Sequence, residues 1–153
     1  CALPILLEEE PAAVRLAARV IDPLALLAKL GLPEPRRRLR ETVAVHDPCH
    51  LAHGQGVREQ PRALLRAICE HPLVPLAESE LCCGSAGTYN LTEPGMAARL
   101  LARKVDAVVA SGAAIVATAN PGCLLQVRSG VLARGLDVRV EHPIDLLARA
   151  HLD

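Results

Sequence analysis

Four of the six cysteines lie in short segments rich in glycine and proline. Cys49 follows Asp-Pro, Cys82 and Cys83 begin the segment CCGSAG, and Cys123 follows Pro-Gly. Glycine and proline are typical of turns, so these four positions favour a chemical role over core packing. Clustered thiols can bind a metal ion, hold an iron–sulfur cluster or exchange disulfides. Cys69 instead continues an apolar helical stripe, where a thiol serves as a small hydrophobic side chain.

The segments around these cysteines alternate between strand-like and helix-like patterns. Short apolar runs are typical of strands, and apolar residues at intervals of three to four are typical of helices. The predicted strands are 42–46, 72–77, 113–118 and 137–141, and the predicted helices are 60–71, 92–112, 121–135 and 143–151. This alternation is typical of α/β proteins. We therefore expect a mostly parallel sheet of about four strands with helices on both faces, preceded by two short helices.

Three predicted strands run into a polar residue followed by proline. These polar residues are Asp47, Asn120 and His142. Proline suits the first turn of a helix, because its missing N–H would have no partner there. Each polar residue is therefore predicted to cap the helix that follows. Cys49 and Cys123 then lie in the first turns of helices that begin at the carboxyl ends of strands.

The carboxyl ends of parallel strands form one edge of a sheet, where α/β proteins bind ligands. Cys82 and Cys83 follow the remaining predicted strand, so they reach the same edge as Cys49 and Cys123. Helix N-termini carry partial positive charge, which lowers thiol pKa values and favours bound anions. The sequence thus predicts one site built from four thiols that are far apart along the chain.

An iron–sulfur cluster is the favoured occupant of this site, with zinc and thiol redox chemistry as alternatives. Gly84 and Gly87 allow backbone N–H groups to approach a bulky inorganic ligand closely. Structural zinc usually takes closely spaced cysteine pairs, which this chain lacks, although three histidines lie near Cys49. Those histidines are His46, His50 and His53. A redox pair of Cys82 and Cys83 would need a strained disulfide between adjacent residues. The alternative zinc site would use Cys49, His53, Cys82 and Cys123.

The composition argues against other classes of function. The chain has 153 residues, with one Tyr, no Trp, no Phe and a formal net charge of zero. Nucleic-acid binding normally uses basic and aromatic side chains, so no nucleic-acid partner is expected. No run of about 18 apolar residues is present, so no transmembrane segment is expected either.

The chain divides into two parts by composition. Residues 1–41 are predicted to be a helical segment with a linker rich in proline and arginine, and residues 42–153 to be the cysteine-rich α/β domain. The arginines of the linker favour a solvated connector over a surface for an anionic partner. The chain starts at Cys1 rather than Met, which we interpret as the start of a partial chain.

The order of the cysteine motifs resembles the cysteine-rich CCG domain of heterodisulfide reductases and related iron–sulfur oxidoreductases. Three stretches carry a closer resemblance to the C-terminal half of glycolate oxidase iron–sulfur subunits. They are HDPCHLAHGQGVREQPRALL, ELCCGSAGTYNLTEPGMAARLLARK and NPGCLLQ. The fuller CCG pattern ends in C-x-x-C, whereas this chain has Asn120 at the first of those positions. Four cysteines remain, which is enough for an ordinary [4Fe–4S] cluster.

The resemblance implies an electron-transfer module within a flavin-dependent complex that oxidises glycolate. The ligands would be Cys49, Cys82, Cys83 and Cys123, and the residues around the cluster would be His50, Gly84, Ser85 and Asn120. FAD would be bound only by partner subunits, and the isolated chain would not oxidise glycolate. The resemblance also implies an upstream ferredoxin-type domain and a cytoplasmic location, with peripheral association with the inner membrane. Related complexes that oxidise lactate or glycerol 3-phosphate, or that resemble heterodisulfide reductase, are the alternatives.

Overall fold

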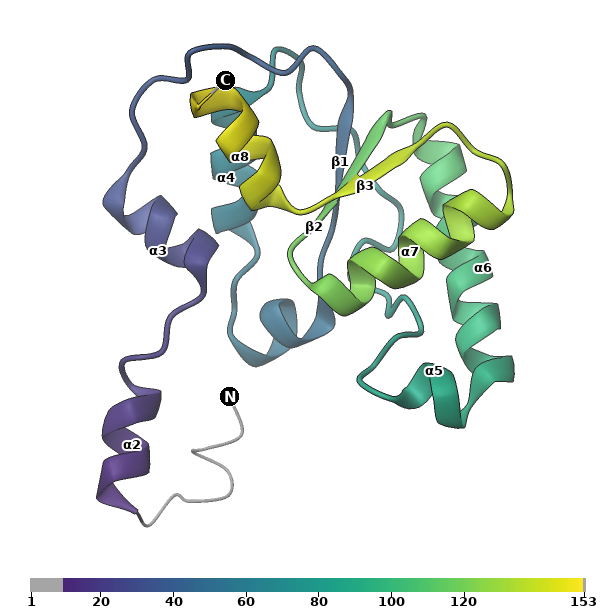
Figure 1. Cartoon of the computed structure of the whole chain (residues 1–153), viewed down its shortest axis with the longest axis horizontal. Helices are drawn as coiled ribbons and strands as arrows, with labels where there is room; N and C mark the ends of the chain where they lie inside the picture. Colours follow the sequence, from purple (N-terminus) through teal and green to yellow (C-terminus); the bar gives the residue numbers. More distant parts are fainter. Residues whose placement is uncertain (1–9, 153) are drawn as a thin grey trace.

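The computed structural model describes residues 10–152, which form a three-stranded sheet with helices on both faces (Figure 1). The strands are β1 (Val43–His46), β2 (Ile115–Thr118) and β3 (Arg139–Glu141). The helices are α2 (Pro11–Ala17), α3 (Pro23–Leu30), the π-helix η1 (His50–Gly54), α4 (Glu59–Ile68), α5 (Tyr89–Thr92), α6 (Pro94–Ser111), α7 (Pro121–Ala133) and α8 (Pro143–His151). The predicted α/β class is confirmed.

The three strands lie in the order β1, β2, β3 and are all parallel. Val43 pairs with Ile115, and Val116 pairs with Val140. Because every strand runs the same way, the segments that follow β1 and β2 emerge at one edge of the sheet. This is the arrangement that the predicted convergence of the cysteines requires.

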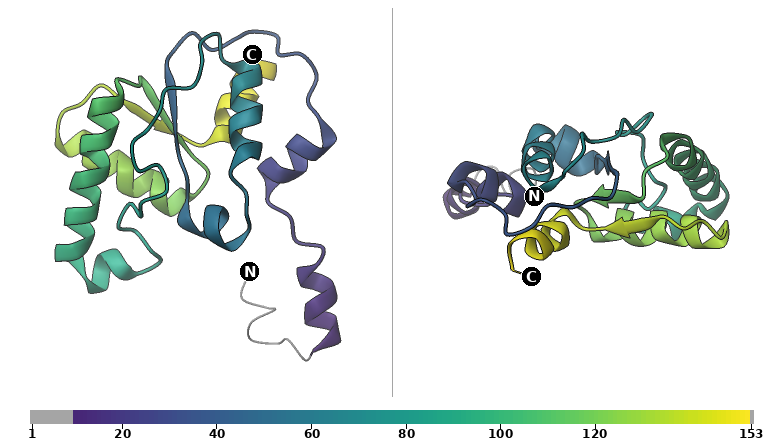
Figure 2. Two further views of the ribbon diagram at one scale, coloured as in Figure 1. Left: turned by 180° about the vertical axis from the view of Figure 1, so that it is seen from behind. Right: turned by 90° about the horizontal axis from the view of Figure 1, so that it is seen from above.

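Side chains of β1 and β2 alternate between two separate cores. Val43, Val45 and Ile115 pack with α3, α4 and α8, whereas Ala44 and Val116 pack with α6 and α7. The alternation follows from the two-residue period of a strand, and both faces are apolar because helices cover both. Figure 2 shows the two groups of helices on the two sides of the sheet. Cys83 and Cys123 belong to the core on the α6 and α7 side.

The predicted count of four strands is wrong by one. The segment 72–77 runs parallel to β1, but it makes a single bridge, between Val74 and Ala44. The backbone N–H of Val74 donates to the carbonyl of Val43 over 2.8 Å. Pro72, at the preceding pairing position, has no N–H to donate, so the ladder does not extend in that direction. The segment still directs the chain towards the edge where β1 ends.

The segment before β1 lies against the domain. Leu39 is buried, and its backbone exchanges hydrogen bonds with Ile68 and Glu70 at the end of α4. Arg37 donates from Nε to the carbonyl of Arg149 in α8. Cys1, interpreted above as the start of a partial chain, lies outside the described residues. None of the described helices has the length and apolar character needed to cross a membrane.

Candidate metal centre

A cavity of about 620 Å³ lies at the edge of the sheet where β1 and β2 end. Three segments that are distant in the sequence line it. The lining residues are Cys49, His50, Cys82, Ser85, Ala86, Gly87, Asn120, Pro121, Gly122 and Cys123. The structure thus brings three of the four candidate cysteines, and three of the four residues predicted to surround the cluster, to one space.

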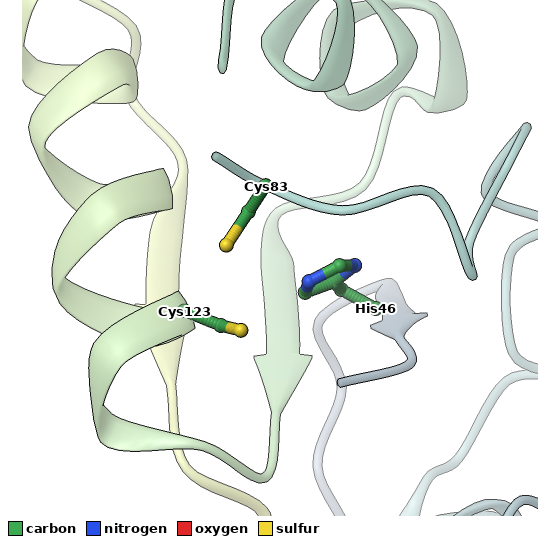
Figure 3. A group of neighbouring side chains, drawn as sticks. All are labelled: His46, Cys83 and Cys123. Atoms are coloured by element: carbon green, nitrogen blue, oxygen red, sulfur yellow. The ribbon is translucent and has the colours of Figure 1, made fainter. Parts of the chain in front are cut away.

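A more deeply buried group lies next to this cavity. Cys83 is 0% exposed, Cys123 is 7% exposed and His46 is 1% exposed. One sulfur or ring nitrogen from each of these residues lies within 4.8 Å of the other two. Figure 3 shows both thiols and the imidazole ring turned towards a common point. His46 comes from β1, Cys83 from the loop before α5, and Cys123 from the first turn of α7.

The pKa values of the two buried thiols are shifted in opposite directions. A hydrogen bond from the Cys123 thiol lowers the pKa of Cys83, and the Ser85 N–H lowers it further, although burial opposes them. The same bond raises the pKa of Cys123, and burial adds to that rise. A thiolate is the form of cysteine that binds metals. Cys83 therefore presents a ready ligand at the centre of the group.

His46 is arranged as metal-binding histidines usually are. Its Nδ1 lies 2.8 Å from the carbonyl oxygen of Ser79, and a carbonyl can only accept, so Nδ1 carries the proton. Its Nε2 is buried and has no hydrogen-bond partner among the described residues. Buried polar atoms are nearly always paired, and a histidine that binds a metal typically donates its other N–H to a carbonyl or carboxylate. The unpaired nitrogen beside two thiols fits a metal or iron–sulfur centre.

The first turn of α7 positions Cys123. The Asn120 side chain accepts a hydrogen bond from the Cys123 N–H over 2.9 Å, which confirms the predicted cap. His142 likewise caps α8 by accepting from the N–H of Ile144, and it does not line the cavity. The predicted cap at Asp47 is wrong. The Arg62 guanidinium binds both oxygens of the Asp47 carboxylate, at 2.5 and 2.7 Å.

The chain after Asp47 forms the π-helix η1 instead of an ordinary α-helix, and Cys49 lies at its N-terminus. Such helices are rare and often occur at functional sites. Cys49 and Cys82 are only partly buried, so they form the outer part of the group while Cys83 and Cys123 form the inner part.

His53 interacts with Arg58 and Glu80 and does not line the cavity. The geometry thus gives no support to the predicted zinc set that includes His53.

The glycines behind Cys83 have the conformations that the sequence predicts. Gly84 has φ of +92° and Gly87 has φ of +66°. Gly84 donates its N–H to the sulfur of Cys82 over 3.3 Å. Ala86, between them, also has a positive φ of 33°, which is unusual for a residue with a Cβ. Strained backbone of this kind is commonly found where a loop must hold a ligand.

Replacing Gly84 with alanine should destabilise the loop more than the same change at Gly87. A Cβ at Gly84 would lie 2.5 Å from the carbonyl oxygen of Ala97, whereas a Cβ at Gly87 would meet nothing within 4 Å. We expect a loss of about 2 to 4 kcal/mol for Gly84→Ala and about 1 kcal/mol for Gly87→Ala. Urea unfolding of the two variants measures the difference, and equal losses would contradict the close packing of the loop on α6.

Three groups at the site have roles that sequence reasoning did not find. They are the Ser79 carbonyl, which accepts from His46, the Arg62 side chain, which binds Asp47, and the Lys104 side chain. Lys104 is buried and donates to the carbonyls of Glu78 and Ser79. A backbone carbonyl leaves no signal in the sequence. Arg62 and Lys104 lie on helices among other basic residues, and only tertiary packing distinguishes them from their neighbours.

The cysteine-rich domain family known as CCG matches residues 43–128, which is more than half of the chain. Three curated proteins illustrate the similarity. The "Probable glycolate oxidase iron-sulfur subunit" of Bacillus subtilis is 40% identical over 112 residues, which cover 72% of this chain and 25% of that protein. The glycolate oxidase iron–sulfur subunit of Escherichia coli is 35% identical over 139 residues, covering 87% of this chain and 32% of that protein. Lactate utilization protein A of Bacillus cytotoxicus is 31% identical over 109 residues, covering 71% of this chain and 46% of that protein.

The chain spans less than half the length of each of these relatives. The family match begins at the first residue of β1 and ends within α7, so it includes all four candidate cysteines. The stretches that carry the resemblance in the sequence are therefore the ones that build the cavity and the buried group beside it. This chain belongs to the cysteine-rich CCG domain family.

Proposed function

We propose that the chain is an iron–sulfur electron-transfer module. Its ligands would be Cys49, Cys82, Cys83 and Cys123, and the cluster would be of the [4Fe–4S] type. The observation that carries the proposal is the convergence of these cysteines around one cavity and one buried group, with the unpaired Nε2 of His46 beside them. When bound, such a cluster accepts and releases single electrons.

Different residues form the inner and the outer side of the proposed cluster site. Cys83 and Cys123 exclude water from its inner side, and Asn120 fixes the turn that carries Cys123. Ser85 and Gly122 pack closely, since a Cβ on Gly122 would lie 3.0 Å from the Ser85 hydroxyl. His50 and the half-buried Cys49 line the outer side. The outer side is therefore the route by which electrons would enter or leave.

The proposed complex oxidises glycolate on flavin subunits that carry FAD, and this chain passes the electrons onwards. The names of the Bacillus subtilis and Escherichia coli relatives support glycolate, and that of the Bacillus cytotoxicus relative supports lactate as the alternative substrate. We expect a ferredoxin-type domain upstream in the full-length protein, and a position at the cytoplasmic face of the inner membrane.

Reduction of the cluster by substrate in the intact complex tests this function. The complex, with its flavin subunits, is mixed with glycolate under anaerobic conditions, and the reduced cluster is followed by EPR. Glycolate should produce the signal, while the isolated chain with glycolate should produce none. Lactate and glycerol 3-phosphate, tested in parallel, distinguish the alternatives. Oxidation of glycolate by the isolated chain without flavin would contradict the assignment.

Zinc remains a second candidate because of one observation. His46, Cys83 and Cys123 offer one nitrogen and two sulfurs within 4.8 Å of one another, which are ligands that zinc accepts. A fourth ligand from Cys49 or Cys82 would complete a structural zinc site. The chain would then be an interaction domain with no role in electron transfer.

A further inference from the structure

Lys104 is the largest side chain of the described residues that is fully buried, with an exposed fraction of 1%. It lies in α6, whose other buried residues are Ala97, Val105 and Val108. A buried ammonium group is costly unless it is paired with negative charge or fully hydrogen-bonded. Its partners therefore indicate why the fold keeps a lysine at this position.

The hydrogen bonds of Lys104 do not neutralise its charge. Its Nζ donates to the backbone carbonyls of Glu78 and Ser79, at 2.5 and 3.5 Å. The carboxylate of Glu78, the residue whose carbonyl accepts from Lys104, is bound by the Arg103 guanidinium instead. Among the ion pairs found in the described part of the chain, none includes Lys104.

The same carbonyls connect Lys104 to the cysteine site. The Ser79 carbonyl that accepts from Lys104 also accepts from His46 Nδ1 over 2.8 Å, and the opposite nitrogen of His46 faces Cys83 and Cys123. The ammonium group is thus separated from the buried thiols by one carbonyl and one imidazole ring.

Of the thiols, Cys83 has the largest electrostatic effect on Lys104. Burial lowers the pKa of Lys104, and among the charges that raise it again Cys83 has the largest effect, ahead of Glu78, Asp47 and Cys82. Together with the hydrogen bonds through Ser79, this couples the positive charge of Lys104 to the anionic form of Cys83.

We propose that Lys104 is the buried counter-charge of the cysteine site and raises the reduction potential of the iron–sulfur centre. The inference rests on the proposed function and extends it to a residue outside the ligand set. Accepting one electron makes the site one charge more negative, and a nearby buried cation stabilises that state. Lys104 does not line the cavity, and its two hydrogen bonds go to backbone carbonyls, so it acts as a positioning and electrostatic residue.

Two variants separate the charge of Lys104 from its hydrogen bonds. Lys104→Gln keeps a donor for the two carbonyls but has no charge, and Lys104→Arg keeps the charge. Arg103→Gln, at the neighbouring exposed position, is the control for a general loss of positive charge. The midpoint potential of the cluster in each purified chain is measured by EPR-monitored redox titration.

Lys104→Gln should disfavour one-electron reduction by about tenfold, which corresponds to a potential about 59 mV more negative. Lys104→Arg and Arg103→Gln should remain near the wild-type potential. If Lys104→Gln folds by circular dichroism but loses its iron while Lys104→Arg retains it, the counter-charge role is also supported. Lys104→Met replaces the Gln variant if that one does not fold.

Two results would overturn the inference, and only one of them would also overturn the proposed function. A cluster with an unchanged potential in Lys104→Gln would show that Lys104 serves only as a hydrogen-bond donor, and would leave the proposed function intact. A wild-type chain with no cluster would overturn the proposed function and this inference together.

Discussion

Replacing Cys83 with alanine is expected to lower the iron content of the purified chain by at least about tenfold, since even the outer partners of a metal ligand contribute that much to affinity. Cys83 is fully buried, and the Cys123 thiol and the Ser85 N–H both stabilise its thiolate. Iron and acid-labile sulfide per chain, measured after anaerobic purification, report the loss.

Cys69→Ala is the matched control for this experiment. Cys69 is also buried, but it lies in the core formed by α3, α4 and α8, on the other face of the sheet. Burial raises the pKa of its thiol, as expected for a packing residue. The control should retain wild-type iron. Full iron content in Cys83→Ala, with a native circular dichroism spectrum, would show that Cys83 is not a ligand.

Replacing Asp47 with alanine is expected to destabilise the chain by about 3 to 5 kcal/mol, because it leaves the Arg62 charge buried without a partner. The Asp47 side chain is 6% exposed and that of Arg62 is 19% exposed. Burial raises the pKa of Asp47, but the Arg62 guanidinium and a hydrogen bond from Ser79 together outweigh it and hold that pKa below its usual range. The pair also fixes the turn between His46 and Cys49. Urea unfolding of the metal-free chain measures the loss.

The exposed pair of Asp106 and Arg134 provides the comparison. The Asp106 side chain is 69% exposed, and exposed ion pairs contribute at most about 1 kcal/mol. Asp106→Ala should therefore change the free energy of unfolding very little. Similar losses for Asp47→Ala and Asp106→Ala would contradict the structural importance assigned to the buried pair.

Local signals in the sequence were sufficient for much of the fold. The proline and cap patterns at Asn120 and His142 predicted the starts of α7 and α8, because caps depend only on neighbouring residues. The same pattern failed at Asp47, where a long-range partner, Arg62, binds the carboxylate. The fourth strand failed for a local reason, since Pro72 lacks the N–H that the preceding bond of the ladder would need.

The convergence of the cysteines could be predicted from the sequence, but the positions of the individual side chains within the site could not. Parallel strands bring Cys49 and Cys123 to one edge whatever the packing around them. Which thiols lie inside, which histidine faces them and where Lys104 places its charge depend on side-chain packing between β1, α6 and α7. Of the three histidines near Cys49, the sequence favoured His50 beside the cluster and His53 in a zinc site, whereas the structure places His46 in the buried group.

The metal and sulfide content of the anaerobically purified wild-type chain tests the central claim most directly. An iron–sulfur module should be brown and contain iron and acid-labile sulfide in equal amounts, about four of each per chain for a [4Fe–4S] cluster. A colourless chain with about one zinc and no sulfide would contradict the claim, and would assign the buried group of His46, Cys83 and Cys123 to a structural zinc site.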